Sequence, residues 1–392
     1  MSPSAPLVRL AEVASVNPPL ADIPGPGERV DFVPMAAVDE ESLTVRPVER
    51  RVYAEVCKGY TPFQNGDLLV AKITPCFENG KIVQADLASR WAVGSTEFHV
   101  IRPNTGKVDA RYLLHFLRQA RVRREGQMKM TGSAGQRRVP AHFLTALRIL
   151  LPALERQRHV ASILDTATAL RAKRRAGLAK LDALTQSFFL DMFGDPGANP
   201  KGWTISTIGN LAEVGTGGTP SRSVGANFGG QMPWVKTTEV NWRVIERTEE
   251  HLTELGFRSS RSRLFPRGSV LVALYGQGKT RGKSAILGLD ATTNQACGVV
   301  LPSPRHDPLF LMHSLKLSYQ RLRDLGRGGN QENLNLGILA SFAIPLPPIE
   351  IQRAFAERIG FVERLARGQQ RSLTELDALF ASLQHRAFNG DL

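Results

Sequence analysis

The sequence has few of the residues from which enzymes build metal and catalytic sites. Its 392 residues include three cysteines, Cys57, Cys76 and Cys297, which have neither an even count nor a metal-binding spacing. We therefore expect reduced, structural thiols in a cytoplasmic protein. The eight histidines are scattered through the chain without ligand spacing to a cysteine. The sequence thus predicts neither a metal centre nor a nucleophile–base pair.

Long apolar runs are also missing. No stretch reaches the roughly 20 residues that a membrane-spanning helix needs. The first residues lack the apolar core of a secretory signal peptide, so we expect the chain to stay in the cytoplasm. A hydrophobic fraction of 42% is ordinary for a globular protein, and the length suits two or three domains.

Two motifs of base and nucleotide chemistry are incomplete. The segment Asn17–Leu20 is similar to the Asn-Pro-Pro-aromatic signature of adenine methyltransferases, but Leu20 replaces the aromatic ring that stacks on a flipped base. The run Gly278–Thr280 ends like a Walker A loop, whose first glycine is replaced by Ala273. A methyltransferase or nuclease with its own active site would need a cofactor loop or an acidic metal cluster, and the sequence suggests neither.

Positive charge is in excess. The formal net charge is +14 at pH 7, which favours binding to polyanions, nucleic acid first and anionic membranes second. Membrane attraction would require a basic amphipathic helix with large apolar side chains. The basic run Arg171–Arg175 instead lies within an alanine-rich segment. We therefore favour nucleic acid as the partner.

An internal repeat organises the chain. Residues 151–193 and 346–388 align without a gap at an offset of 195, and 14 of the 43 aligned positions are identical. Chance would provide about two or three identities, so the repeat is real. Each copy opens with Leu-Pro, continues with Glu, Gln and Arg, and then shows a helical pattern about 40 residues long. Such a helix would extend about 60 Å, which suits a spacer.

Apolar residues in both copies recur at alternating spacings of three and four, the seam of a coiled coil. Each seam is polar in its middle, at Arg171 and Arg174 in the first copy and at Gln369, the equivalent of Arg174, in the second. We expect the two helices to lie against each other with their polar centres facing. The alternative is that each helix packs only on its own domain. The predicted seam residues are Leu164, Leu178, Leu181, Phe188, Ile359, Val362, Leu373, Leu376, Phe380 and Leu383.

The regions before the two helices repeat one order of elements. In the first region we expect strands over Asp31–Val38, Leu43–Val56 and Leu68–Ile73, then a helix over Tyr112–Arg124 and a basic glycine loop over Arg124–Pro140. The second region repeats this order, with a helix over 310–325 and a glycine loop over 326–335. We therefore divide the chain into domain 1 (1–150), helix 1 (151–199), domain 2 (200–345) and helix 2 (346–392).

Three short segments in the second half carry a family resemblance. They are Asn294–Ala296 before a strand, Gly329–Gln331 before Asn-Leu, and Ile344–Arg353, the opening of the repeated helix. In this doubled arrangement, the chain resembles the specificity subunits of type I restriction–modification systems over nearly its whole length. The first half departs at Ser95–Glu97, which stands in place of Asn294–Ala296.

The resemblance implies a mixed α/β (α+β) fold in which two target-recognition domains are joined by two long conserved helices packed as an antiparallel coiled coil. Each domain would read one half of a split double-stranded DNA target, and the helices would set the distance between the halves. The subunit would not be an enzyme and would bind no cofactor itself. It would recruit two modification subunits, which use S-adenosylmethionine to methylate adenine N6, and restriction subunits that use ATP and magnesium.

Two related functions stay open at this point. One is a specificity subunit that works with a fused methylase–nuclease. The other is a DNA-binding adaptor outside restriction–modification, although a transcription factor would usually show a compact reader such as a helix-turn-helix. The loops of the two halves differ, so the half-sites should differ and the target should not be a palindrome.

Direct readout of DNA requires Arg, Lys, Asn or Gln at base edges and basic side chains at phosphates. The glycine loop Tyr275–Lys283 follows a strand in the second domain, and the loop Lys72–Lys81 matches it in the first. The alternative for each residue is a solvated surface charge. We interpret Gln136 and Gln331 as structural because they recur in both halves. The predicted DNA contacts are Lys72, Thr74, Lys81, Lys129, Arg137, Arg138, Lys236, Thr237, Tyr275, Gln277, Lys279, Arg281, Lys283, Arg327 and Asn330.

Overall fold

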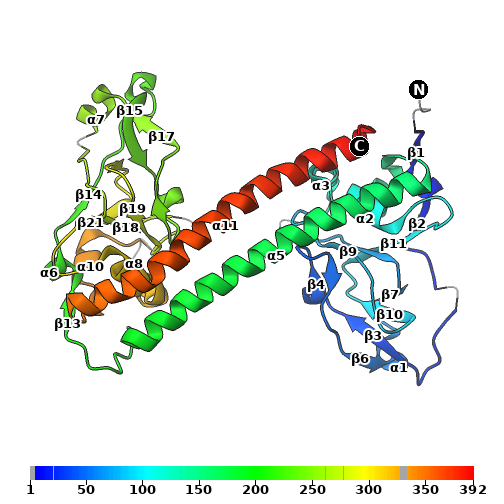
Figure 1. Cartoon of the computed structure of the whole chain (residues 1–392). Coiled ribbons are helices and arrows are strands. Elements are labelled where there is room, and N and C mark those ends of the chain that lie inside the picture. Colours follow the sequence, from blue (N-terminus) through cyan, green and yellow to red (C-terminus); the bar gives the residue numbers. More distant parts are fainter. Residues whose placement is uncertain (1–4, 21, 134, 261, 277, 327–332) are drawn as a thin grey trace. The chain divides into compact units, whose positions relative to one another are not determined.

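The computed structural model contains two compact units, each with one domain and one end of each long helix (Figure 1). The first unit comprises Met1–Gly177 and Gln369–Leu392, and the second comprises Leu178–Gly368. The structure describes residues 5–20, 22–133, 135–260, 262–276, 278–326 and 333–392. Both units mix strands with helices, as the α/β expectation requires.

The described part of the first domain consists of short strands, four α-helices and two 3-10 helices before the first long helix. Its elements are β1 (Leu7–Arg9), η1 (Leu10–Glu12), β2 (Ala14–Val16), β3 (Arg29–Val33), η2 (Met35–Ala37), β4 (Val38–Asp39), β5 (Thr44–Val45), β6 (Arg50–Val52), α1 (Tyr53–Val56), β7 (Thr61–Gln64), β8 (Leu68–Ala71), β9 (Ile82–Gln84), β10 (Trp91–Gly94), β11 (Phe98–Pro103), α2 (Ala110–Leu117), α3 (Ala120–Lys129), α4 (Ala141–Ala146) and β12 (Arg148–Leu150). They form two four-stranded sheets, in the orders β2-β11-β8-β9 and β6-β3-β10-β7, and the small ladders β1-β12 and β4-β5.

The largest buried cluster of the first domain includes residues of both β8 and α2. All four residues of β8 are fully buried, as expected for a continuous apolar run covered on both faces. Asp109 caps α2 by accepting hydrogen bonds from the backbone N–H groups of Arg111 and Tyr112. The ladder between β1 and β12 brings the first strand of the domain beside its last one.

Three predicted elements of the first domain differ in the structure. The strand expected over Asp31–Val38 stops at Val33, because Pro34 has no N–H group for a strand ladder. The strand expected over Leu43–Val56 is split by a segment containing Pro47 into β5 and β6, and it ends in α1.

The helix expected over Tyr112–Arg124 is two helices. Gln119 has an extended ψ of 139°, which separates α2 from α3. The second helix then continues to Lys129, so the basic glycine loop begins later than expected. At this break, the side chain of Arg118, the C-cap residue of α2, donates to the backbone carbonyls of Gly80 and Glu40.

The second domain repeats this order with its own additions. Its elements are β13 (Ile205–Thr207), α6 (Ile208–Leu211), β14 (Val214–Thr216), η3 (Gly225–Asn227), β15 (Phe228–Val235), η4 (Thr237–Glu239), β16 (Val244–Ile245), β17 (Glu250–Leu252), α7 (Glu254–Ser259), β18 (Val270–Ala273), β19 (Ser284–Leu287), β20 (Thr292–Thr293), β21 (Cys297–Val300), α8 (Pro308–Leu317), α9 (Tyr319–Asp324), α10 (Leu336–Ser341) and β22 (Ala343–Pro345). The sheets are β14-β21-β18-β19-β16, β17-β15-β20 and β13-β22.

The two domains share one topology. The sheet β2-β11-β8-β9 corresponds to β14-β21-β18-β19, and the ladder β1-β12 corresponds to β13-β22. The helices α2, α3 and α4 recur as α8, α9 and α10. The remaining large sheets differ, since β6-β3-β10-β7 has four strands and β17-β15-β20 has three. The repeat that we inferred from the order of elements is therefore present in the fold.

The two repeated segments are α5 (Leu154–Phe193) and α11 (Ile349–Asn389), of 40 and 41 residues. Each ends at a glycine with positive φ, Gly194 at 79° and Gly390 at 89°, a conformation that glycine adopts at low cost. Among the described residues, no helix is both long and apolar enough to span a membrane.

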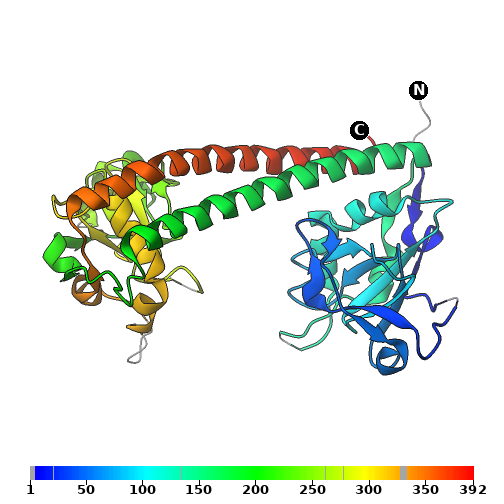
Figure 2. The ribbon, with the colours of Figure 1, turned by 60° about the horizontal axis from the view of Figure 1, so that its bottom comes forward.

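The long helices pack antiparallel within each unit. In the first unit, Leu164 near the start of α5 shares a core with Phe388 near the end of α11. In the second unit, Phe193 at the end of α5 shares a core with Phe355 near the start of α11. Figure 2 shows α2 between α5 and the strands of the first domain, where its buried residues join this core.

Candidate nucleic-acid interface

A buried glutamine attaches the first domain to its helix. Gln157, in the first turn of α5, is 0% exposed. Its side-chain oxygen accepts a hydrogen bond from the backbone N–H of Asp109 at 2.8 Å. Its amide nitrogen donates to the carbonyls of Pro152 and Lys107, at 2.8 and 3.1 Å. Because Asp109 caps α2, this glutamine joins the start of α5 to the start of α2. We call α2 and its counterpart α8 the core helices of their domains.

Gln352 makes the same connection in the second unit. It is also 0% exposed, and it accepts from the backbone N–H of Asp307, the N-cap of α8, at 2.9 Å. Its amide donates to the carbonyls of Pro347 and Arg305, at 2.8 and 3.4 Å. The glutamine of the repeated motif is therefore explained by a buried junction that the fold uses twice.

The polar centre of the helix pair is visible in the first unit. Arg174 of α5 donates to the side-chain oxygen of Gln369 of α11. Arg171 and Arg175 both pair with Asp377, and the guanidinium of Arg171 lies 4.3 Å from the centre of the Phe380 ring. None of the predicted seam residues falls in the exposed class. The prediction that polar positions of the two helices face each other is confirmed here.

Aromatic side chains seal the helix ends in the second unit. Phe189 and Phe193 of α5 contact Phe355 of α11, with ring centres 5.4 and 5.3 Å apart. Phe310 of α8 stacks on Phe189 at 5.8 Å. Through Phe310 the helix α8 packs on α5, and α5 in turn contacts α11, so the alternative in which each long helix packs only on its own domain is wrong.

A buried histidine links α2 to both long helices in the first unit. His115 Nε2 lies 2.7 Å from Asp165 of α5, which also accepts from Arg111, and its backbone carbonyl accepts from Gln384 of α11. Burial lowers the pKa of His115, although Asp165 opposes the change. Burial alone would raise the pKa of Asp165, but the hydrogen bonds from His115 and Arg111 lower it to about 2.

The second unit has a matching arrangement. His313 of α8 is buried and lies 3.4 Å from Glu363 of α11, while its ring meets Phe355 edge to face at 5.7 Å. Lys316 of α8 pairs with Asp182 of α5. Each core helix is thus tied by charged or polar contacts to both spacer helices.

The predicted contacts of the second domain fall into two groups. Tyr275 and Lys279 are exposed on the loop after β18, with Tyr275 40% exposed. Lys283 is half-buried and donates to the side chain of Asn241 at 2.7 Å. Arg281 is only 5% exposed. Tyr275 and Lys279 are therefore accessible to a partner, whereas Arg281 is covered by the domain and Lys283 is partly covered.

Two further predicted residues of this domain lie on η4 and just before it. Lys236 is held between Glu249 and Glu250, at 3.1 and 2.7 Å, and the hydrogen bond to Glu250 raises its pKa. Thr237 is half-buried. Lys236 thus stays charged and is already paired with two acidic neighbours. Gln277, Arg327, Asn330 and Gln331 lie outside the described residues.

In the first domain, Lys129 and Arg137 are exposed, and Arg137 donates to the carbonyl of Met130 at 3.0 Å. Lys72 is half-buried. Gln136, which we interpreted as structural, is exposed. Its assigned role stays a prediction.

The remaining three residues of this set have partners inside the domain. Thr74 donates to the carboxylate of Glu78. Lys81 donates to the backbone carbonyl of Val38 at 3.2 Å. Arg138 pairs with Glu97 at 2.7 Å, and this hydrogen bond lowers the pKa of Glu97.

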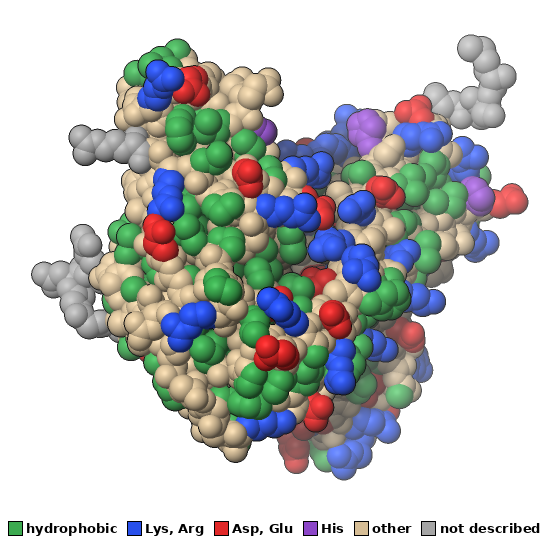
Figure 3. Space-filling model, turned by 60° about the vertical axis from the view of Figure 1, so that its left-hand side comes forward, with side chains coloured by type: hydrophobic (Ala, Val, Ile, Leu, Met, Phe, Trp, Pro, Cys, Tyr) green, Lys and Arg blue, Asp and Glu red, His purple; other side chains and the backbone are tan. Residues whose placement is uncertain are grey.

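On one face of the second unit, the basic side chains of the described residues do not gather into a continuous patch (Figure 3). On the face that Figure 3 brings forward, Lys and Arg side chains alternate with acidic and hydrophobic ones. Such a surface gives weaker long-range attraction than one continuous basic patch.

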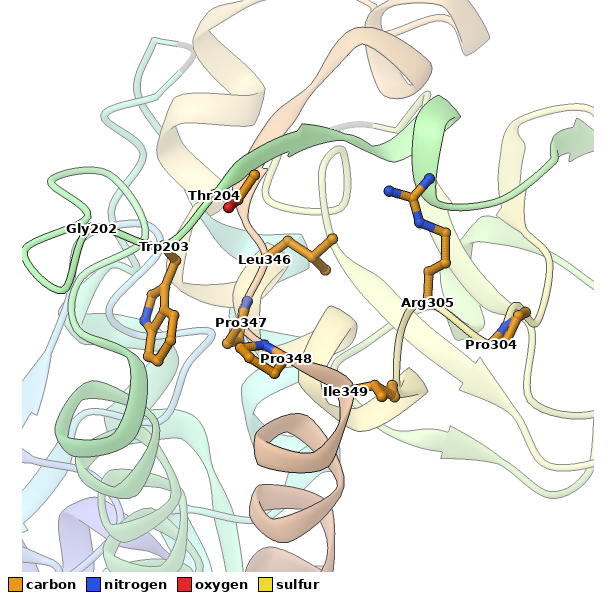
Figure 4. Close-up of a pocket in the computed structure, with 9 residues that line it drawn as sticks. All are labelled: Gly202, Trp203, Thr204, Pro304, Arg305, Leu346, Pro347, Pro348 and Ile349. Carbon is orange, nitrogen blue, oxygen red and sulfur yellow. The ribbon is translucent and has the colours of Figure 1, made fainter.

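An open pocket of about 590 Å³ lies at the start of α11 in the second unit (Figure 4). Trp203, Arg305, Pro347 and Pro348 contribute to its walls. Trp203 donates its indole N–H to the carbonyl of Phe193 at 3.0 Å, and Arg305 donates to the carbonyl of Asn210. These side chains hold segments of the unit together, and the pocket contains none of the predicted DNA contacts.

Sequence reasoning missed the side chains that support the loops. Arg118, Arg123 and Arg323 lie on or beside helices and donate to backbone carbonyls of the glycine loops. Their positions after the two core helices gave only a weak signal, because an arginine in a helix is usually a surface charge. The bonding role of Gln157 and Gln352 was also missed, although their repetition was noticed.

Comparison with known protein families matches both halves of the chain. The model of the type I restriction modification DNA specificity domain matches residues 50–180 and 200–375. These two matches include most of both domains and much of both long helices.

Named relatives agree with that match. The EcoAI specificity subunit of Escherichia coli is 37% identical over 152 residues, which are 38% of this chain and 26% of that protein. The chain thus matches only about a quarter of that relative's length. The EcoR124I/EcoR124II specificity subunit of the same species is 25% identical over 208 residues, 51% of this chain and 50% of that protein. A MjaX specificity subunit of Methanocaldococcus jannaschii, described as putative, is 20% identical over 83% of this chain and 78% of its own.

Solved structures show the same fold. The S subunit of a type I restriction–modification system from M. genitalium superposes with a TM-score of 0.61 at 11% identity, covering 99% of this chain and 97% of the other. A chain from a study of assembly and conformational transition of the type I R-M system has a TM-score of 0.50 at 20% identity, covering 100% and 99%. At these identities the likeness concerns the fold.

Proposed function

The chain belongs to the DNA specificity subunits of type I restriction–modification systems, which are the non-catalytic components of these complexes, and we propose that it reads a bipartite, asymmetric DNA target. One observation carries the proposal. Two domains of the same topology are attached to their helices by the same glutamine junction, yet they carry different loops. A repeated attachment with unequal loops fits a protein that places two different readers on one duplex.

The proposed organisation follows the repeat. Domain 1 (1–150) and domain 2 (200–345) would each read one half-site, and the helices of 151–199 and 346–392 would set the distance between them. In prokaryotes the DNA lies in the cytoplasm, so we propose that the protein is located in the cytoplasm.

We propose that the exposed polar side chains of the loops contact DNA. Tyr275 and Lys279 in the second domain, and Lys129 and Arg137 in the first, present side chains to solvent. Hydrogen-bonding groups at base edges give sequence preference, and cations at phosphates give affinity. The residues already paired inside the domains, such as Lys81 and Arg138, would support the loops instead.

A map of N6-methyladenine in the native host, with and without this gene, tests the function. We expect one split, asymmetric motif to lose its methylation when the gene is deleted. Survival of every methylated motif would contradict the proposal for a system with active partner genes.

Binding by the purified chain tests the loop. Lys279→Ala should weaken binding and reduce the slope of log K against log salt concentration by about 1, as the loss of one phosphate contact does. Arg358→Ala removes an exposed cation from α11 and should change neither quantity. If Lys279→Ala changed affinity and salt slope as little as Arg358→Ala, the loop would lie outside the interface.

We propose that the partners are two modification subunits, bound through the repeated outer faces of the long helices. Leu170 and its equivalent Leu365 are 49% and 41% exposed, and Leu184 and Leu379 are 43% and 52% exposed. The acidic and basic members of the repeated motif, Glu155 with Arg158 and Glu350 with Arg353, are exposed as well. Exposed apolar residues that recur identically fit two copies of one partner.

In this arrangement the modification subunits would supply S-adenosylmethionine chemistry at adenine N6, and restriction subunits would supply ATP- and magnesium-dependent cleavage. Leu170→Lys together with Leu365→Lys should lower the number of modification subunits per chain, measured by native mass spectrometry. Leu255→Lys is the control, because Leu255 is 56% exposed on α7 and has no repeated partner. Unchanged stoichiometry in the first variant would place the partners elsewhere.

A further inference from the structure

The loop after β18 has a backbone that cannot hold its shape through its own preferences. Gly276, Gly278 and Gly282 all have positive φ, at 149°, 59° and 86°. Glycine adopts these values at little cost, but it also leaves many other conformations open to the chain. A loop that reads bases must present its side chains in one arrangement, so it needs support from outside.

Arg323 on α9 provides that support. One terminal nitrogen of its guanidinium donates to the carbonyl of Arg281 at 2.9 Å, and the other donates to the carbonyl of Gly278 at 3.0 Å. It also donates to the hydroxyl of Tyr319 at 2.9 Å, and that hydroxyl in turn donates to the carbonyl of Lys279 at 2.6 Å. Two side chains of one short helix thus hold the backbone carbonyls of three residues of the loop, Gly278, Lys279 and Arg281.

The fit around these side chains is close. A Cβ atom added to Gly282 would lie 3.1 Å from Cγ of Arg323 and 3.4 Å from the ring of Tyr319. Trp242 packs edge to face on the Tyr319 ring, with centres 5.4 Å apart. The glycine therefore lets the arginine and tyrosine approach the loop backbone, and Trp242 limits the movement of the tyrosine.

The first domain repeats the arrangement with other residues. Arg123 on α3 donates to the carbonyl of Glu78 at 2.5 Å. Gly80, at φ 76°, takes the place of Gly282, and a Cβ atom there would lie 3.4 Å from Cδ of Arg123. Arg118 adds a bond to the carbonyl of Gly80. Since α3 follows α2 as α9 follows α8, Arg123 and Arg323 occupy the same place in the two domains.

Phe77 supplies a second attachment in the first domain. Its side chain is fully buried and packs on Gly126 of α3, where an added Cβ atom would come within 2.5 Å of the ring. Arg123, three residues earlier on the same helix, holds the next residue of the loop by its hydrogen bond to the carbonyl of Glu78. The support of the loop is thus kept in both halves, whereas the loop sequences themselves differ.

We infer that Arg123 and Arg323 are positioning residues for DNA recognition, which hold the backbone of the two loops so that the loop side chains meet base edges in one geometry. The inference rests on the proposed DNA-reading function of the loop Tyr275–Lys283, and it extends that function to the matching loop Lys72–Lys81 of the first domain. The planar guanidinium can bridge two carbonyl groups at once, which the single ammonium group of lysine cannot do in the same geometry. Because the guanidinium of Arg323 is used by the loop backbone, its contribution to DNA binding is indirect.

The test compares Arg323→Lys with Arg323→Gln in the full chain. Binding is measured to a duplex carrying the motif found by methylation mapping, and to duplexes in which one half-site or the other is altered. We expect both variants to lose about tenfold or more of the discrimination at one half-site only. The salt dependence of Arg323→Lys should stay at the wild-type value, since charge is conserved. Arg123→Lys should relax the other half-site.

Matched variants separate positioning from simple structural damage. Arg321→Lys is the control, because Arg321 lies on the same helix and donates to a carbonyl at Pro196, outside the loop, at 3.0 Å. It should keep full discrimination. Tyr319→Phe removes only the hydroxyl bonded to Lys279 and should relax the same half-site as Arg323→Gln, to a smaller extent. The unaffected half-site reports in every case that the chain is folded.

Two outcomes would overturn the inference. Wild-type discrimination in Arg323→Lys, with a reduced salt slope in Arg323→Gln, would identify Arg323 as a phosphate contact. A uniform loss of binding to all duplexes would indicate a general structural role. If Lys279→Ala also leaves binding unchanged, the loop itself lies outside the interface and the proposed function of the loop fails. If Lys279→Ala weakens binding while the Arg323 variants keep full discrimination, only the positioning role fails.

Discussion

Arg174 donates a hydrogen bond to Gln369, and these two residues are equivalents of each other in the internal repeat. In an antiparallel pair of repeated helices, a residue faces its own equivalent only at the centre of the repeat. The pair Arg174 and Gln369 therefore marks the centre of the antiparallel helix pair. Polar residues at coiled-coil seams commonly fix the register of the helices at some cost in stability.

Replacing the polar pair with apolar residues should stabilise the helices and weaken their register. We expect Arg174→Leu with Gln369→Leu to leave the free energy of unfolding unchanged or to raise it by about 1–4 kcal/mol, as for other ion and polar pairs replaced by packed apolar residues. Gln369→Leu alone should lower it by about 1–3 kcal/mol, because the guanidinium loses its acceptor. Chemical denaturation measures all three proteins. A double variant less stable than the single one would contradict the assignment.

Removing the buried glutamine junction should destabilise its unit. Gln157→Leu leaves the N–H of Asp109 and the carbonyl of Lys107 without their partner, and buried unsatisfied groups cost about 1–3 kcal/mol each. We therefore expect a loss of at least about 2 kcal/mol in unfolding experiments. Arg158→Ala, at the exposed neighbour, should change stability by less than about 0.5 kcal/mol. Similar stability of both variants would show that the junction is dispensable.

Two helical glycines should respond oppositely to alanine. Gly126→Ala should cost about 1–3 kcal/mol, because its Cβ atom would overlap the Phe77 ring in a filled core. Gly177→Ala should be stabilising by up to about 1 kcal/mol, because nothing lies within 4 Å of the added atom and alanine favours a helix. Thermal unfolding distinguishes the two. A destabilised Gly177→Ala would indicate that this position needs glycine for another reason.

The stability of the first unit should fall in acid through two neighbouring groups. Burial lowers the pKa of His115 below its ordinary value of 6.5, so the unfolded chain binds a proton more readily and stability decreases as the pH falls below about 6.5. The pKa of Asp165 is lowered from 3.8 to about 2, so its contribution is present above pH 3.8 and is lost as the pH falls from there towards 2. Denaturant titrations at a series of pH values measure both windows.

His115→Gln separates the two windows. Glutamine can donate to Asp165 but does not titrate, so the decrease below pH 6.5 should become smaller while the decrease below pH 3.8 remains. Asp165→Asn should remove the lower window. An unchanged profile in His115→Gln would assign the upper window to another histidine.

Much of the arrangement was predictable because its signals are local or repeated. The repeat of 43 positions, the helical period and the closing glycines placed α5 and α11 within three residues of their true limits. The buried strand β8 was also expected, whereas the helices predicted over 112–124 and 310–325 are each divided into two, α2 with α3 and α8 with α9. The interruptions at Pro34 and Pro47 were not expected, although proline restricts strands, because alternating apolar residues on both sides concealed them.

The candidate contacts were less predictable. Lys81, Arg138 and Lys236 have the composition of DNA-binding residues, yet each has partners within its own domain. A sequence does not show whether an arginine or lysine points to solvent or to a carbonyl brought close by another part of the chain. Distinguishing the two requires the positions of backbone groups far away in the sequence.

The sequence by itself determined the doubled architecture, the long paired helices and the class of partner, because a repeat, a seam period and a net charge of +14 are properties of residue order and composition. Only the tertiary structure decided that Gln157 and Gln352 fasten domains to helices, and that Arg123 and Arg323 hold loops. These roles depend on hydrogen bonds to backbone groups, and every residue offers the same backbone groups. The fold alone selects which of them lie within reach.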